Sequence, residues 1–431
     1  MSAGVNRRAI WALALPAMLT NVATALFGLA DLWVIGRLGD AGAQGAVELG
    51  ARFITSLLVV FNFLRTGTTA LTAQSSGHGG EQVATLARAL VLAGGIAALL
   101  VAAERWIVPP GLGWLGARGN VAGMAGAYVA RRYWAVPAAL ANGVLAGWLV
   151  GQRQVRGVLA AEVGANLVHI ALDLTLVLGA GWGVAGVATA SALSEWLKLL
   201  FLAALVARRG DWGERGVIWR ASAFRRLLSL NRDLFLRTLL LTGVMLEFTR
   251  AGAQAGAVTL AANAILFQMF MLSALILDGF ETAAQVLCGE AAGHRDGGQL
   301  RAAVRACLGL GWLTGVAIAA VYALAGGRIA AGFSLDPAVR DAAADFVPWA
   351  AALPVLGVTS FVMDGVFMGA GWVRAMLGTM VVSFAVFNAA LHLFAPLGNH
   401  GLWLAFCLLF VARAGGQAIC LPGLARRSMR G

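Results

Sequence analysis

Long apolar runs, separated by short polar breaks, follow one another along the whole chain. A helix needs about 20 mostly apolar residues to cross the hydrocarbon core of a bilayer. The pattern therefore predicts twelve membrane-spanning helices, near 9–36, 46–75, 84–108, 122–150, 156–180, 183–207, 234–254, 257–288, 302–325, 342–369, 375–395 and 400–423. The first run follows two arginines, as in a secretion signal, but it is too long and lacks a clear cleavage site, so we expect it to stay as the first span.

Composition narrows the class of protein further. Of the 431 residues, 60% are hydrophobic and only 12% are charged, whereas soluble domains are roughly 25% charged. A soluble enzyme, a disordered scaffold and a small secreted module are therefore excluded. The four cysteines show no paired spacing, so we expect neither a disulfide framework nor a zinc site, and we predict no bound metal and no cofactor.

The arginines predict the orientation in the membrane. The net charge of +12 is almost entirely arginine, and these residues gather in the gaps between apolar runs. Such a distribution indicates topology rather than nucleic-acid binding. With the N-terminus inside, the inner gaps hold most of the arginines, so we expect both termini in the cytoplasm of a bacterial inner (plasma) membrane. The partners expected are the lipid bilayer and small molecules, with no nucleic acid, and the protein is expected to be monomeric.

The two halves of the chain repeat. The segment GAVELGARF from Gly45 is similar to GAVTLAANA from Gly256, and GWLVGQRQVR from Gly147 is similar to GVFMGAGWVR from Gly365. The common order and similar offset predict two pseudo-symmetric six-helix lobes related by an axis along the membrane normal. We expect an N-terminal lobe over 1–207, a polar cytoplasmic connector over 208–233 and a C-terminal lobe over 234–431.

Ionisable residues within spans are candidates for ion coupling, because burying them is costly. Asp31 lies well inside the first span, and Asp173 lies toward the end of the fifth. Asn166, His169 and Asp173 are three and four residues apart, which places them on one helix face. Two carboxylates with a titratable imidazole predict a proton or cation site.

The second half contains a more scattered polar set. The candidates there for a substrate cavity or for gating are Asp278, Glu281, Gln285, Asp364, Glu247, Asn263, Gln268, Met245, Met269 and Phe267. Asp278 and Asp364 are also interpreted as structural hydrogen-bonding groups at close helix contacts. Prolines within spans, namely Pro16, Pro137 and Pro354, predict helix kinks that either reshape a cavity or only fit a helix to its neighbours. Glu195 and Lys198, three residues apart, predict a local ion pair.

The chain resembles the MATE (multidrug and toxic compound extrusion) family, in its DinF-like bacterial branch. The resemblance covers essentially the whole chain and includes LALPAMLTNVATALFGLADLWVIGRLG, NLVHIALDLTLVLGAGWGVAGVATA, LILDGFETAAQVLCGEAAG, FVMDGVFMGAG and GNHGLWLAF. It implies twelve helices in two lobes, with Asp31 as the central coupling residue and Asp173 as its fifth-helix partner. The family usually has asparagine at the position of His169, and this difference favours protons over sodium.

The resemblance implies a secondary active antiporter that exports amphipathic or cationic organic compounds in exchange for H+, or less favourably Na+. Within transport, the alternative is a lipid-linked oligosaccharide flippase of the same superfamily, which would have a more cationic central cavity. A polytopic membrane-embedded transferase is the alternative from another class. It would need a clustered catalytic set and a large exposed loop, and the sequence contains no nucleotide-binding or hydrolase motif, so we do not expect an enzyme.

Overall fold

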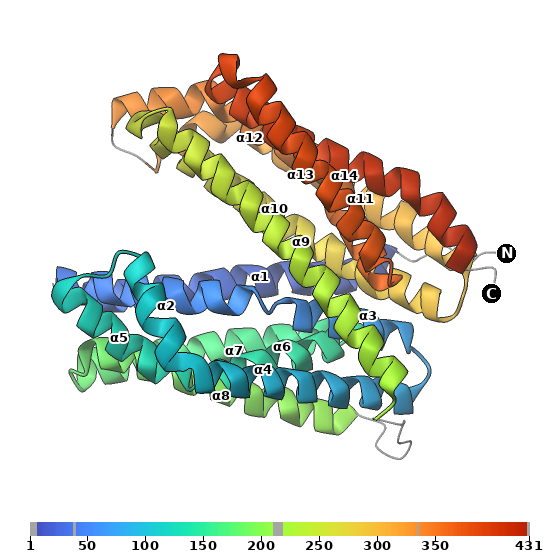
Figure 1. The fold of residues 1–431 in the computed structure, drawn as a ribbon, viewed down its shortest axis with the longest axis horizontal. Helices are drawn as coiled ribbons and strands as arrows, with labels where there is room; N and C mark the ends of the chain where they lie inside the picture. The colour runs from blue at the N-terminus through green and yellow to red at the C-terminus, as the bar shows by residue number, and fades with distance from the viewer. Residues whose placement is uncertain (1–6, 38–39, 210–218, 334–335, 429–431) are drawn as a thin grey trace. The chain divides into compact units, whose positions relative to one another are not determined.

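The computed structural model describes residues 7–37, 40–209, 219–333 and 336–428. Within these ranges the chain is helical and contains no strand (Figure 1). The elements are α1 (Arg7–Gly36), α2 (Ala41–Val59), α3 (Phe63–Gln74), α4 (Gly79–Trp114), α5 (Gly119–Tyr133), α6 (Val136–Gly151), α7 (Val155–Asp173), η1 (Leu174–Gly179), α8 (Gly183–Arg209), α9 (Ala221–Gln254), α10 (Ala257–Gly293), α11 (Gly297–Ala331), α12 (Pro337–Gly369), α13 (Val373–Leu393), η2 (Ala395–Leu397) and α14 (Asn399–Ser428).

Each of the twelve predicted spans coincides with one of these helices or with two consecutive ones. Among the described residues, nine helices are long and apolar enough to cross a membrane, and the bent pair α5 and α6 makes a tenth. Of the remaining two, α1 includes side chains outside the description, and the apolar part of α9 contains Arg237, Glu247 and Arg250. The predicted all-α polytopic fold is confirmed.

The chain divides into two compact units. One comprises Met1–Met18 with Ser229–Gly431, and the other comprises Leu19–Leu228. The helix α9 begins at Ala221, inside the segment predicted as the connector, while residues 210–218 of that segment lie outside the described residues. We refer below to Leu19–Leu228 as the N-terminal unit and to the other as the C-terminal unit.

In the N-terminal unit, α6 is the central helix. Twelve of its residues are buried, and it packs against α3, α4 and α8. Its contact with α3 is close, because a Cβ added at Gly147 would lie 2.4 Å from the backbone oxygen of Arg65. Pro137 lies in the first turn of α6, just after a 49° bend from α5. The proline thus marks the predicted change of direction at the start of a helix, where its missing N–H costs no hydrogen bond.

In the C-terminal unit, aromatic side chains form the core. Phe248, Phe270, Phe406 and Trp403 are buried, with Phe248 and Phe406 ring centroids 5.0 Å apart. The rings of Phe248 and Trp403 also lie 5.0 Å apart and meet edge to face at 78°, an arrangement that stabilises a core beyond simple burial. The other two prolines predicted to kink helices lie inside helices, Pro354 in α12 and Pro16 in α1.

The helices α10 and α12 cross in backbone contact. A Cβ at Gly365 would lie 2.1 Å from the carbonyl oxygen of Glu281, and one at Gly369 would lie 2.2 Å from that of Gln285. Two glycines four residues apart present one smooth strip, which lets two helix backbones approach as membrane helices commonly do. Side chains near this crossing are therefore held on a rigid helix pair.

Candidate functional site

One face of α7 carries four polar residues. Glu162, Asn166, His169 and Asp173 follow one another at spacings of four, three and four, so they form a stripe along the helix. Glu162, His169 and Asp173 are buried. Directly after Asp173 the helix changes to a π-helical turn over Leu174–Gly179, a distortion that is frequent at functional sites.

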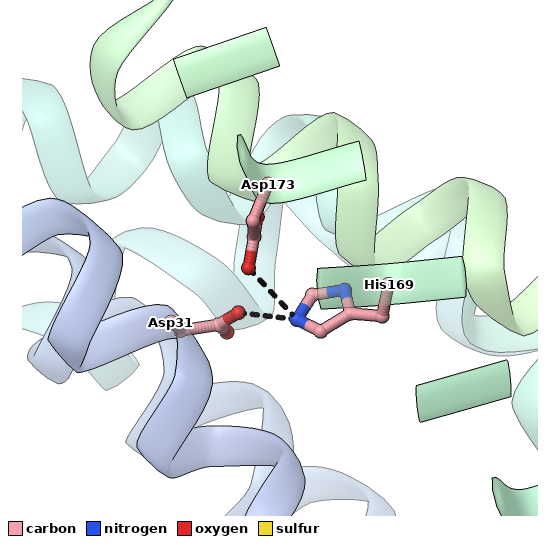
Figure 2. A group of neighbouring side chains, drawn as sticks. All are labelled: Asp31, His169 and Asp173. Carbon is pink, nitrogen blue, oxygen red and sulfur yellow. Dashed lines mark hydrogen bonds and ion pairs between the residues drawn. The ribbon is translucent and has the colours of Figure 1, made fainter. Parts of the chain in front are cut away.

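The structure brings Asp31 of α1 to this stripe (Figure 2). The His169 Nε2 atom lies 2.5 Å from Asp31 Oδ1 and 3.2 Å from Asp173 Oδ2. All three side chains are at most 1% exposed. The imidazole thus lies between two carboxylates that are 142 positions apart in the sequence. The spacing of four predicted that His169 and Asp173 share a helix face, and the packing of α1 adds Asp31 to them.

Three further residues complete this cluster. Ser191 of α8 donates a hydrogen bond to Asp31 Oδ2 at 3.4 Å, and Arg132 Nη1 lies 3.7 Å from the same oxygen. Arg132 in turn donates to the Tyr128 hydroxyl at 2.5 Å. Sequence reasoning did not identify these three residues. Arg132 resembled an arginine that marks the end of a span, although its spacing of four from Tyr128 was a usable signal.

The charges of the cluster favour the uptake of one proton. Two carboxylates and one guanidinium leave a net charge of −1 while the imidazole is neutral, and one added proton makes the cluster neutral. An uncompensated charge in a buried site is expensive. The cluster is therefore arranged to bind one positive charge and to hold it between Asp31, His169 and Asp173.

The same three residues could also ligate a metal ion, since one ligand atom from each lies within 4.8 Å of the others. An ion bound at about 2.0–2.2 Å would have to separate His169 Nε2 and Asp31 Oδ1, which are 2.5 Å apart, to roughly 3 Å or more. The guanidinium of Arg132 adds a positive charge that opposes a second cation.

A second group of charges lines a cavity of about 310 Å³ within the N-terminal unit. Lys198 Nζ lies 3.0 Å from Glu162 and 3.6 Å from Glu195. The predicted pair of Glu195 and Lys198 is thus present, and Glu162 extends it to a triad. Asn166 is set apart from both groups, because it donates to the backbone oxygen of Ala23 at 2.7 Å.

In the C-terminal unit, Asp364 is the centre of a buried ionic cluster. Arg237 of α9 and Arg413 of α14 both donate to its Oδ2, and Gln417 donates to Oδ1 at 2.6 Å. A carboxylate that accepts from two guanidiniums and an amide is fully bonded, which fits a structural role. Glu281 and Gln285 lie on α10 at its crossing with Gly365 and Gly369, and Asp278 precedes Glu281 by three residues.

The remaining candidates of the second half lie in three kinds of surroundings. Asn263 forms a reciprocal amide pair with Asn399, at 2.7 and 2.9 Å, and accepts from Trp403 at 2.9 Å. Met269 is fully buried in the aromatic core, against which Met245 and Phe267 pack. Glu247 is half-buried and Gln268 is exposed.

Comparison with protein families gives one family for both halves. The MatE family model matches residues 16–175 and again residues 234–394. The two matches begin 218 residues apart, which agrees with the offset between the repeated segments GWLVGQRQVR and GVFMGAGWVR. The internal repeat predicted from the sequence is thereby supported.

Relatives extend over nearly the whole chain. The DNA damage-inducible protein F of Escherichia coli K12 is 36% identical over 430 residues, covering 98% of this chain and 93% of its own. A probable multidrug resistance protein NorM of Bradyrhizobium diazoefficiens is 30% identical, covering 96% and 93%. A crystal structure of MATE in the bent conformation matches with a TM-score of 0.86 at 20% identity, covering 98% and 96%, which establishes the likeness of fold.

Proposed function

The chain belongs to the MatE family of multi-pass membrane transporters, and from this premise we propose that it exports amphipathic or cationic organic compounds in exchange for protons. The observation that carries the proposal is the buried cluster of Asp31, His169 and Asp173, which one proton makes neutral. The name of the related NorM protein, a probable multidrug resistance protein, supports efflux as the activity.

In this proposal Asp31 couples the proton to the conformation of α1. With the cluster deprotonated, Asp31 accepts from His169 and Ser191 and faces Arg132. Proton binding redistributes these hydrogen bonds, so the two protonation states favour different positions of α1. A transporter needs only such a bias between outward-open and inward-open states for coupling.

Efflux from proteoliposomes under separately imposed gradients tests the proposal. We expect an amphipathic fluorescent cation such as ethidium to move when a proton gradient alone is applied, and not when a sodium gradient alone is applied. Transport that follows the sodium gradient at constant pH would instead assign the Asp31 cluster to sodium.

We expect the substitution His169→Asn to move the pH midpoint of transport to lower pH. The asparagine keeps a hydrogen-bonding side chain but removes the imidazole, so the proton must reside on a carboxylate. A free aspartic acid side chain binds a proton about 2.5 pH units below a free imidazole. Efflux measured between pH 5 and 8 at equal protein content, with the exposed His294→Asn variant as the control, checks this. An unchanged profile would mean that His169 only packs.

We also expect both termini and the segment 208–233 to lie in the cytoplasm of an inner-membrane protein, because the arginines concentrate there. In a cysteine-free background, Ser222→Cys, at an exposed position in α9, should resist a membrane-impermeant thiol reagent in intact cells and react after lysis. Asn120→Cys, exposed at the start of α5 in a gap predicted to be outside, should react in intact cells. The reverse pattern would invert the proposed topology.

A further inference from the structure

The helix α11 of the C-terminal unit has one long side that no other helix covers. Its substantial contacts among the described elements are with α10 and α12. Of the nine long apolar helices it has the smallest buried share, 22% of its apolar segment. Its exposed side chains include Trp312, Leu313 and Val316. In a membrane-spanning protein a large exposed apolar side of this kind faces lipid.

The charges along α11 mark the edges of the hydrocarbon layer. Residues 306–327 contain no charged side chain, and Arg305 and Arg328 flank them. These 22 residues extend about 33 Å along a helix, close to the roughly 30 Å of the hydrocarbon core of a bilayer. Arg305 therefore lies at one boundary of the core, and Arg301, about one turn before it, lies at the level of the lipid headgroups.

The two arginines lie on the same face of α11 as its exposed apolar residues. Arg301, Arg305, Leu308 and Trp312 follow one another at spacings of four, three and four, which places them in one row. Both arginines are exposed, and neither makes an ion pair or a hydrogen bond with any residue that the structure describes. Two guanidiniums without a protein partner thus precede an apolar surface at the membrane boundary.

The nearest acidic residues along the chain do not neutralise this pair. The carboxylate of Asp296 caps α11, accepting from the backbone N–H of Gln299 at 2.9 Å. Glu290 is buried in α10 at 7% exposure. The row on α11 therefore presents two positive charges to the headgroup layer.

The fold itself does not require the two arginines. The offset of 218 between the two family matches relates α11 to α4, and the pair Gly79–Gly80 then corresponds to Gly297–Gly298 at the start of each helix. At the positions equivalent to the two arginines, α4 has Val83 and Ala87. The equivalent helix thus forms without a positive charge at either position, so the pair on α11 needs an explanation outside the fold.

We propose that Arg301 and Arg305 together bind the phosphate of one anionic phospholipid, whose acyl chains lie along Leu308 and Trp312. Side chains four residues apart on a helix have Cβ atoms about 5–6 Å apart, so two planar guanidiniums can donate to the oxygens of a single phosphodiester. Two uncompensated positive charges favour a lipid with a net negative charge, such as phosphatidylglycerol. They disfavour phosphatidylcholine, whose ammonium would approach the same guanidiniums. This site is separate from the proposed transport reaction.

Equilibrium binding of tritiated phosphatidylglycerol to the immobilised protein in detergent tests the proposal, with unlabelled phosphatidylcholine as competitor. We expect the tightest-bound phosphatidylglycerol to be preferred at least about tenfold, because each arginine near a membrane surface strengthens the binding of an anionic lipid by about fivefold. The double variant Arg301→Gln, Arg305→Gln should lose this preference. Arg426→Gln, Arg427→Gln removes the same charge from the exposed last turn of α14 and should keep it. Equal losses in both variants would show that diffuse positive charge attracts the lipid, and no loss in the α11 variant would also overturn the proposal.

Two further measurements keep the test decisive. Both arginines are exposed, so their replacement leaves no buried charge unpaired, and a thermal melt in phosphatidylcholine nanodiscs checks that the double variant is folded. If it melts early, Arg301→Gln and Arg305→Gln are measured singly, and each should weaken phosphatidylglycerol binding about fivefold; no weakening in either would refute the site. Millimolar inorganic phosphate should not displace the lipid, because it has no acyl chain to contact the apolar row. Full displacement by phosphate would assign the arginines to a soluble anion instead.

Discussion

The substitution Asp31→Asn is expected to abolish proton-driven efflux while the protein remains folded. The amide keeps the shape of the carboxylate but cannot ionise. The cluster would then have a net charge of zero before proton binding and +1 after it, instead of −1 and zero. A buried amide also costs less than a buried carboxylate. Efflux from proteoliposomes under a pH gradient should fall by about two orders of magnitude or more, the range over which positioned proton-transfer groups act.

Two variants serve as comparisons for this result. Asp173→Asn should reduce efflux less, since His169 and Asp31 remain in contact at 2.5 Å. Asp40→Asn changes an exposed residue that caps α2 through the backbone N–H of Ala43, a role that asparagine performs equally well, so it should transport at the wild-type rate. If well-folded Asp31→Asn did so too, Asp31 would not couple the proton to transport.

The second large effect is expected on stability. Asp364→Asn should destabilise the C-terminal unit by about 3–5 kcal/mol, because it removes the negative charge that the partly buried Arg237 and the buried Arg413 both bind. A thermal melt in detergent measures the loss of stability. Efflux normalised to the amount of folded protein measures the loss of transport, so the two effects can be separated.

The stability effect has its own controls. Asp296→Asn, at an exposed N-cap of α11, should leave the melting temperature nearly unchanged, since asparagine is an equivalent cap. Combining Asp364→Asn with Arg413→Gln removes one unpaired guanidinium and should recover part of the loss. A normal melt for Asp364→Asn together with defective efflux would assign Asp364 to the transport reaction instead.

The helices were predictable from the sequence because they depend on local periodicity, and so was the proximity of His169 to Asp173 in the proton cluster. Asp173 and His169 share a helix, so their spacing alone placed them together, and Asp31 stood out as a carboxylate within an apolar run. The contacts of Arg132 and Ser191 with Asp31 were not predictable, because no periodicity relates positions on α5 and α8 to positions on α1; only the spacing of four between Tyr128 and Arg132 was a local signal. Asp31 and Asp173 were paired because both are carboxylates within spans of the first half, and the resemblance to the MATE family implied the same pairing.

Charged pairs within one helix were also predictable elsewhere in the chain, whereas ionic partners on different helices were not. Glu195 and Lys198 were recognisable as a pair at a spacing of three, but Glu162, on another helix, was visible only once α7 and α8 packed together. Asp364 was predicted to act in a substrate cavity or in gating, or to be structural, and the structure adds the two arginines that bind it. Ionic partners from distant helices depend on tertiary packing, which a hydropathy pattern does not encode.

The backbone crossing of α10 and α12 has a consequence for how this protein can diverge. The chain has 56 glycines, and they are not equivalent. At Gly365 and Gly369 even a methyl group would collide with a carbonyl oxygen of the facing helix, whereas an added Cβ at Gly378 or Gly415 meets nothing within 4 Å. In a library of random variants selected for a folded protein, the first two positions should stay invariant and the last two should accumulate alanine and larger residues.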